Sequence, residues 1–216
     1  MQVVENQAFV RSRVRIGNIA NLVSLVLLGV GFGLSFMGPN FGPEAIFFAY
    51  VAMIAALLAL SFGRTFTRRW GPRFRQDQLL EPALRGLDNR HTLFNYASPD
   101  LPDHVLVGPT GLYLLVPRAN GGTIRFDGRR WRRGSIGGAL LRNLAEGGLG
   151  DPIGDVRRSM SLLATYLKKH GSEETVKGLE ARPIIVFTNP QARVEARHSP
   201  VPVVHVRELR SVFRRA

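Results

Sequence analysis

The chain has 216 residues, no cysteine and a formal net charge of +13. This length suits one domain with an additional segment, and the large positive charge favours anionic partners. The absence of cysteine excludes disulfide bonds, thiolate nucleophiles and Cys-based zinc sites.

Two long apolar runs follow the N-terminus, and no charged residue occurs between Arg15 and Glu44. Each run has about the 20 residues that a membrane-spanning helix needs. We predict transmembrane helices at residues 17–38 and 45–63. The connection between them is too short for anything other than a tight turn, so the two helices form an antiparallel hairpin.

Basic residues flank this hairpin but are absent from its turn. Arg11, Arg13 and Arg15 precede the first run, and five arginines follow the second. Because basic residues stay on the cytoplasmic side, we expect the N-terminal segment 1–16 and the region after the second run in the cytoplasm. The chain is therefore expected to be an integral protein of a bacterial plasma membrane, with an uncleaved anchor in preference to a signal peptide.

Small residues in the first run favour close helix approach. Gly29 and Gly33 are four residues apart, with Gly31 between them. This spacing permits tight packing between helices. The hairpin could in this way pair with another membrane protein or with a second copy of the chain.

The basic juxtamembrane segment at residues 64–75 combines five arginines with aromatic side chains. Such a composition directly after a span is typical of a segment that lies on an anionic membrane surface. Nucleic acid is the alternative partner. The predicted lipid-surface residues are Arg64, Arg68, Arg69, Trp70, Arg73 and Arg75.

Residues 76–216 predict a cytoplasmic α/β domain with a mixed sheet flanked by helices. A short helix is expected within residues 77–88, with Pro82 close to its start. A second helix begins at Pro152 after the N-cap Asp151 and covers the sheet. A final basic helix is expected within residues 207–216.

The predicted strands lie between these helices. The run at residues 182–187 is uniformly apolar, which implies a buried strand with a parallel neighbour. Strands bounded by Pro and Gly clusters precede it and form an antiparallel meander. The remaining strands are expected at residues 91–97, 104–108, 112–117, 123–128 and 201–206.

The sequence DHVLVGPTGLYLL, residues 103–115, reads as two strands about a Gly-Pro-Thr-Gly turn. With the later NGG, Trp131, the Asp-Pro that opens a helix, and RPIIVF, it resembles the NERD (nuclease-related) domain. The resemblance covers residues 77–209. It implies a restriction-endonuclease-like fold of the PD-(D/E)xK superfamily, in which some members are anchored by one or two N-terminal spans.

In active members of that superfamily, two carboxylates hold a divalent cation, usually Mg²⁺, and a lysine orients the attacking water. By this resemblance Asp103 takes the first acid position, whereas the acid-x-Lys triplet reads Val116-Pro117-Arg118. Val116 cannot ligate a metal. Arg118 cannot take up a proton, although it can clamp a phosphate. Asp155 stands where the family's helix tends to carry a glutamine.

Two interpretations of this pattern stay open. In the first, Asp103 and Asp155 form a displaced Mg²⁺ site together with Asp77 or Glu81, and the protein is a metal-dependent nuclease. In the second, which we favour, the site has lost its central ligand, holds no cofactor and no longer hydrolyses phosphodiesters. Asp155 is then a first-turn acid that the helix dipole stabilises.

The segment GRRWRRG, residues 128–134, is the most basic part of the domain that also contains an aromatic residue. We predict DNA or RNA binding through Arg118 and this segment, with Trp131 stacking on a base. In the alternative, strand alternation buries Trp131 and turns the arginines to water. The arginines of this segment are Arg129, Arg130, Arg132 and Arg133. A third hypothesis is a membrane scaffold without enzymatic activity that rests on anionic lipid.

Overall fold

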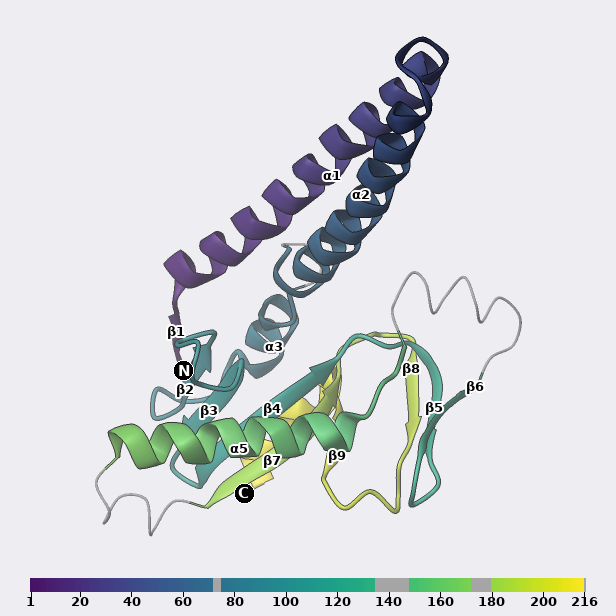
Figure 1. Cartoon of the computed structure of the whole chain (residues 1–216). Coiled ribbons are helices and arrows are strands. Elements are labelled where there is room, and N and C mark those ends of the chain that lie inside the picture. Colours follow the sequence, from purple (N-terminus) through teal and green to yellow (C-terminus); the bar gives the residue numbers. More distant parts are fainter. Residues whose placement is uncertain (72–74, 135–147, 172–179, 216) are drawn as a thin grey trace. The chain divides into compact units, whose positions relative to one another are not determined.

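The computed structural model describes residues 1–71, 75–134, 148–171 and 180–215. It divides into two compact units, a helical hairpin at Gln7–Arg75 and a domain that joins Met1–Asn6 to Gln76–Ala216 (Figure 1). The predicted combination of two long apolar N-terminal helices with a mixed α/β domain is confirmed.

The hairpin consists of α1 (Gln7–Phe41) and α2 (Pro43–Trp70), joined at Gly42. Both helices are long and apolar enough to cross a membrane. Their ends differ from the predicted ones, because α1 extends into the expected turn and α2 continues through most of the basic juxtamembrane segment. Gly42 has a φ of 84°, a value that glycine adopts without steric cost, so one residue reverses the chain.

Small residues spaced by seven line the contact between α1 and α2. On α1 the buried positions include Gly17, Ser24 and Gly31, and on α2 they include Ala56 and Gly63. A Cβ atom at Gly63 would lie 2.1 Å from Asn21 Oδ1, and one at Gly31 would lie 2.9 Å from Met53 Cγ. A seven-residue repeat keeps one helix face against its partner.

Gly29 and Gly33 do not take part in the contact between α1 and α2, so their pairing with a helix of another chain stays a prediction. A Cβ atom at either position would meet nothing within 4 Å. The reason is the helical period: Gly31, between them, is on the seven-residue repeat, and its two neighbours in the pattern face away from α2.

The domain contains two sheets. The larger has the order β1-β2-β3-β4-β7-β9, with β2, β3 and β4 antiparallel and the pairs β1–β2, β4–β7 and β7–β9 parallel. The smaller has the order β6-β5-β8. The strands are β1 (Gln2–Glu5), β2 (Thr92–Asn95), β3 (His104–Gly108), β4 (Gly111–Arg118), β5 (Gly122–Phe126), β6 (Trp131–Gly134), β7 (Ala181–Phe187), β8 (Ala192–Glu195) and β9 (Val203–His205).

This topology confirms the mixed sheet and the parallel neighbour of β7, but it corrects the predicted meander. The strand expected at residues 123–128 forms as β5, yet it pairs with β6 and β8 and leaves the larger sheet. Gly122 begins β5 with a φ of 87°. The chain therefore changes direction between β4 and β5, at the Asn-Gly-Gly sequence.

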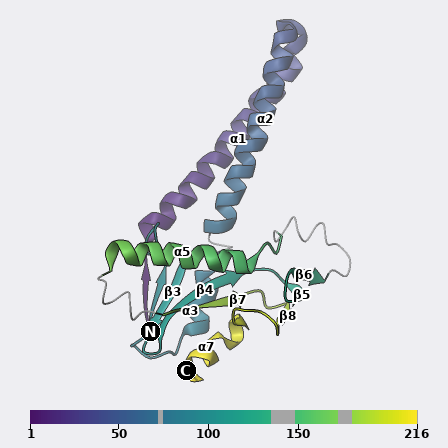
Figure 2. The ribbon, with the colours of Figure 1, turned by 60° about the horizontal axis from the view of Figure 1, so that its bottom comes forward.

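Helices cover both faces of the larger sheet, with α5 (Pro152–His170) on one face and α3 (Asp77–Leu84) and α7 (Leu209–Arg215) on the other (Figure 2). A short 3-10 turn, η1 (Val206–Glu208), precedes α7. α5 begins at the predicted proline. Pro82 lies in the last turn of α3 and not near its start, so that prediction is wrong.

Two apolar clusters hold these layers together. On the α5 face, Val156 and Leu163 pack with strand residues such as Leu114 and Ile185. On the other face, Leu80 and Leu209 belong to a cluster with residues of β3, β4 and β7. Each fully buried leucine of this kind contributes about 1.5–3 kcal/mol relative to an exposed one. The centre of the sheet is thus fixed from both sides.

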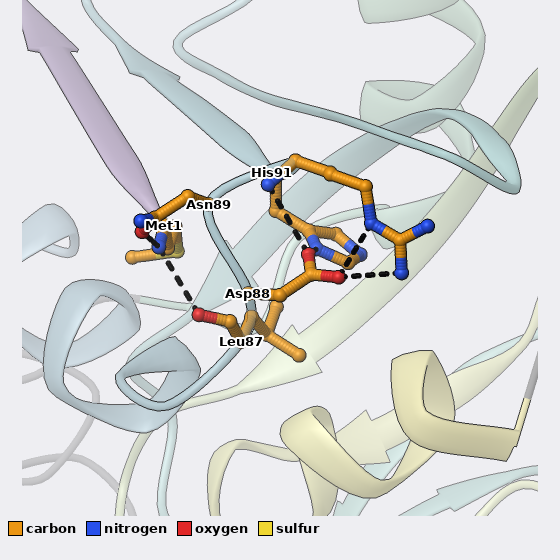
Figure 3. Close-up of polar contacts among 6 residues, drawn as sticks. Met1, Leu87, Asp88, Asn89 and His91 are labelled. Carbon is orange, nitrogen blue, oxygen red and sulfur yellow. Dashed lines mark hydrogen bonds and ion pairs between the residues drawn. The ribbon is translucent and has the colours of Figure 1, made fainter.

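The first strand of the chain is part of the domain. β1 pairs in parallel with β2, in the register Gln2↔Thr92. The Met1 ammonium donates to the Leu87 carbonyl and to Asn89 Oδ1, both at 3.1 Å (Figure 3). Residues 1–6 therefore belong with the domain, whereas the sequence placed them in a separate segment.

This pairing predicts that a fragment of residues 76–216 is incomplete, because it leaves the backbone groups of the β2 edge unpaired. We expect a fusion of residues 1–6 to residue 76, through about 15 Gly and Ser residues, to be more stable. Each restored hydrogen bond adds about 1 kcal/mol, so the unfolding midpoint should rise by roughly 5–10 °C. Circular dichroism melting measures this difference.

The matched control is the same fusion with Gln2–Glu5 replaced by Gly and Ser residues. It should melt like the bare fragment. Equal melting of all three proteins would show that β1 does not stabilise the domain.

Candidate functional site

Polar residues gather where β4 and β7 end at the same edge of the larger sheet. Thr188 follows β7, and its amide donates to the Arg118 carbonyl at 2.8 Å. The Thr188 hydroxyl contacts Gln76 Oε1 at 2.6 Å and the Arg118 carbonyl oxygen at 3.1 Å. The start of α3 is thereby held beside the end of β4. In α/β folds the carboxyl ends of parallel strands are the usual place for a binding site.

Arg118 and Asp155 meet at this edge as an ion pair. An Arg118 terminal nitrogen donates to Asp155 Oδ2, which links the end of β4 to the first turn of α5. The other carboxylate oxygen of Asp155 lies 3.3 Å from a terminal nitrogen of Arg158. Both oxygens of this carboxylate are therefore engaged by guanidinium groups.

The Arg118 side chain is the more buried partner, with 18% of its surface exposed against 34% for Asp155. Burial lowers the pKa of Arg118 from its ordinary value, Asp151 opposes this shift, and Arg158 adds to it. An arginine nevertheless stays charged at neutral pH. Arg118 Nε is buried and has no hydrogen-bond partner among the described residues. The Arg118 guanidinium is therefore a fixed positive charge whose Nε–H donates no hydrogen bond to a described residue.

Asp103 and Val116 lie on neighbouring segments toward the same edge. Asp103 directly precedes β3, which pairs with β4 with Val105 opposite Leu114. The Asp103 carbonyl accepts a hydrogen bond from the Tyr96 amide at 2.8 Å. Val116 is 8% exposed and belongs to the apolar cluster under α5. The position at which the NERD resemblance would place a carboxylate is thus part of the apolar core.

Two acidic side chains of α3 belong to the predicted displaced site, Asp77 at its start and Glu81 in its middle. Asp77 is buried and Glu81 is half-buried. Within the parts of the chain that the structure describes, no three His, Asp or Glu side chains are grouped so that they could hold a metal ion. The topology brings three aspartates toward the same edge of the larger sheet. They are Asp77 at the start of α3, Asp103 just before β3 and Asp155 in the first turn of α5.

The basic segment at residues 128–134 lies in the β5–β6 hairpin. The Trp131 ring packs against Phe126, with centroids 4.9 Å apart, and against Phe187 at 6.0 Å. The Arg133 Nε donates to the Gly121 carbonyl at 2.8 Å. Trp131 thus contributes a packing surface, as the alternation of the strand implies.

Asp127 organises the turn before β6. It accepts from the amides of Arg130 and Arg129, at 2.7 and 2.9 Å, and its other oxygen lies 3.2 Å from Arg132 Nε. The hydrogen bonds from these two amides, with the neighbouring arginine charges, lower the pKa of Asp127. Arg129 and Arg130 are both exposed, and no hydrogen bond joins their guanidinium groups to a described residue.

The predicted lipid-surface residues differ in their surroundings. Arg64 and Arg69 are exposed on α2, and the Arg69 guanidinium lies 5.3 Å from the Trp70 ring centroid. Trp70 itself is buried, and its ring meets Phe9 edge-on at 5.3 Å. Arg75 is half-buried. The side chain of Arg68 and all of Arg73 lie outside the described residues.

A further polar cluster was not predicted from the sequence. Asp88 Oδ1 lies 2.6 Å from His91 Nδ1, and its other oxygen contacts Arg90 Nε at 2.7 Å (Figure 3). Hydrogen bonds from Arg90 and then His91 lower the pKa of Asp88. The stabilisation that the ionised Asp88 carboxylate gives the folded state is complete above its unfolded pKa of about 3.9. It is lost as the pH falls through the lowered pKa of the folded state.

The His91 ring explains one glycine of the Gly-Pro-Thr-Gly turn. A Cβ atom at Gly108 would lie 2.6 Å from His91 Cδ2, so only glycine fits there. Gly111, on the other side of the turn, has a φ of 126°. Both glycines are therefore required by packing and backbone geometry. The sequence signal for the polar cluster is the Asp-x-x-His spacing of Asp88 and His91.

No family model, curated protein or solved structure matches the chain. The assignment to the NERD family therefore stays a prediction from the sequence. The function has to be inferred from that resemblance together with the geometry of the sheet edge.

We predict that the two partners of Asp155 differ in their effect on stability. Asp155→Asn removes the ion-pair partner of the partly buried Arg118 charge, while Asp151 still interacts with it, and should cost about 1–3 kcal/mol of unfolding free energy. Arg158→Gln is the matched control, because Arg158 is 77% exposed and should cost less than about 0.5 kcal/mol. Urea unfolding of the full chain in detergent, followed by Trp fluorescence, measures both. Equal losses of unfolding free energy in the two variants would contradict the stabilising role of the Arg118–Asp155 ion pair.

Proposed function

We propose that the protein is a membrane-anchored, nuclease-related domain that has lost hydrolysis and binds nucleic acid through its basic surface. The observation that carries this proposal is the Arg118–Asp155 ion pair at the edge where the resemblance would place a metal site. A guanidinium neutralises this carboxylate in place of a divalent cation.

The neighbouring residues support loss of activity. Val116 occupies the central ligand position with a methyl-bearing side chain inside the apolar cluster under α5. A site that retains only Asp103 has too few oxygen ligands to hold Mg²⁺ in the geometry it requires. Arg118 keeps a positive charge at the lysine position but cannot exchange a proton with water.

The hairpin supports membrane anchoring. Large apolar side chains such as Leu22, Leu25, Phe36, Leu57 and Leu58 are each more than half exposed along α1 and α2. Exposed apolar surface of this extent is stable in lipid and not in water. The pairing of β1 with β2 within one sheet supports a topology in which both ends of the hairpin lie on the same side of the membrane. The flanking arginines favour the cytoplasmic side of a bacterial plasma membrane.

Exposed arginines support binding of nucleic acid. Arg129 and Arg130 are exposed at the tip of the β5–β6 hairpin, and their guanidinium groups form no salt bridge with a described residue. Arg125, on the same hairpin, is paired with Glu195 at 2.7 Å. Contacts of exposed arginines with phosphates depend on salt and carry little sequence preference.

For hydrolysis, we expect the full chain in detergent micelles to leave labelled DNA and RNA intact with either Mg²⁺ or Mn²⁺. Gel analysis of the products after long incubation is the measurement. The alternative function, a nuclease with displaced carboxylates, is favoured by the position of Asp103 at the site edge. Metal-dependent cleavage that disappears in Asp103→Ala would establish that alternative and refute the inactive site.

For binding, we expect the double substitution Arg129→Gln and Arg130→Gln to weaken the affinity for DNA and RNA. The slope of log K against log salt should become shallower by about 1.5, since two phosphate contacts are lost. Fluorescence anisotropy at several salt concentrations measures it.

Arg125→Gln is the control for this experiment, because its charge is already paired, and it should change the slope by less than about 0.5. Tight binding of the wild-type chain to anionic liposomes, with none to nucleic acid, would replace this proposal with the scaffold hypothesis.

A further inference from the structure

A groove in the hairpin has the chemistry of a phospholipid site. It has a volume of 560 Å³ and is formed by the first turns of α1 and the end of α2. Its lining includes charged, polar and apolar side chains. Those on which the inference rests are Arg11, Arg15, Asn18, Leu22 and Arg75.

The order of these side chains along α1 follows the order of groups in a phospholipid. Arg11, Arg15, Asn18 and Leu22 are separated by four, three and four residues, so they share one helix face. From the first to the last the helix rises about 16 Å. Along this distance the face changes from cationic to polar to apolar, as the lipid environment changes from headgroup to acyl chain.

The two α1 arginines at the cationic end of the groove favour a shared anion. Arg11 and Arg15 are like charges one turn apart, an arrangement that destabilises a helix unless an anion lies between them. The Arg11 guanidinium donates to Gln7 Oε1 at 2.8 Å, and Arg15 pairs with no acidic side chain among the described residues. Arg75 adds a third positive charge to the lining, which includes no acidic residue.

The other end of the groove is apolar and accessible. Ile19 and Leu22 are 51% and 62% exposed, while Val10 and Trp70, which also line it, are 4% and 6% exposed. The buried pair forms a rigid wall, and the exposed pair offers contact to a hydrocarbon chain. A free inorganic anion would leave this half of the groove unused.

We infer that the groove binds one anionic glycerophospholipid, with its phosphate between Arg11, Arg15 and Arg75 and an acyl chain along Ile19 and Leu22. This inference rests on the proposed membrane anchoring and adds a specific lipid site to it. Basic pockets between membrane helices are known to bind such headgroups.

The test uses the full chain, delipidated in a neutral detergent and titrated with phosphatidylglycerol or phosphatidylcholine of identical acyl chains. Native mass spectrometry reports bound lipid, and the thermal midpoint reports its effect. We expect saturation at one phosphatidylglycerol per chain. The double substitution Arg11→Gln and Arg15→Gln should weaken that binding about 30-fold.

The matched control removes the same charge outside the groove, with Arg13→Gln and Arg64→Gln. Arg13 lies over the Phe9 ring, 5.0 Å from its centroid, and does not line the groove. The control should change the affinity less than about twofold. Equal weakening by both double variants, or equal binding of the two lipids, would overturn the inference.

Two further arms separate the other possible occupants. Inorganic phosphate and glycerol 3-phosphate should not raise the thermal midpoint, and an equal rise with either would identify a free-anion site and overturn the lipid. Dimerisation that protects the groove without lipid would overturn it as well.

Alkaline carbonate extraction of cell membranes tests the anchoring separately, and all variants should stay in the pellet. Extraction of the wild-type chain would refute the anchoring itself. Retention of the chain, with lipid binding that does not depend on Arg11 and Arg15, would refute only the groove.

Discussion

The pairing of β1 with β2 is the interaction on which the organisation of this protein depends. It makes the domain discontinuous in sequence, since its edge strand precedes the hairpin and the rest follows it. The hairpin is consequently an insertion between two neighbouring strands of one sheet. A connection of this kind can cross a membrane only an even number of times, which ties the topology of the helices to the integrity of the sheet.

Where β4 and β7 end, an ion pair sets the local electrostatics. A partly buried carboxylate needs a nearby cation to offset its lost hydration. In metal-dependent sites that cation is exchangeable and polarises water. Here the Arg118 guanidinium lies in an ion pair with Asp155 and offsets the charge of that carboxylate. In the function that we propose, this pair takes the place of an exchangeable metal ion.

The sequence predicted those elements whose signals are local. Pro152 after Asp151 marked the start of α5, and the uniformly apolar RPIIVF marked a buried parallel strand. β1 was missed because the strand has only four residues and most of them are exposed. The Arg118–Asp155 pair joins residues 37 positions apart, and no local pattern indicates such a contact. The contact of Gly31 with α2 was not predicted, because the four-residue motif was weighed and the seven-residue repeat was not.

The discontinuous domain also has a consequence for how the protein is made. β1 leaves the ribosome before its partner strand β2, which is synthesised only after both apolar helices and the basic segment. The sheet therefore cannot close during the early part of translation. If the helices enter a bilayer as they emerge, they are inserted before the domain is complete. The sheet then closes late, and only when the hairpin has the correct orientation.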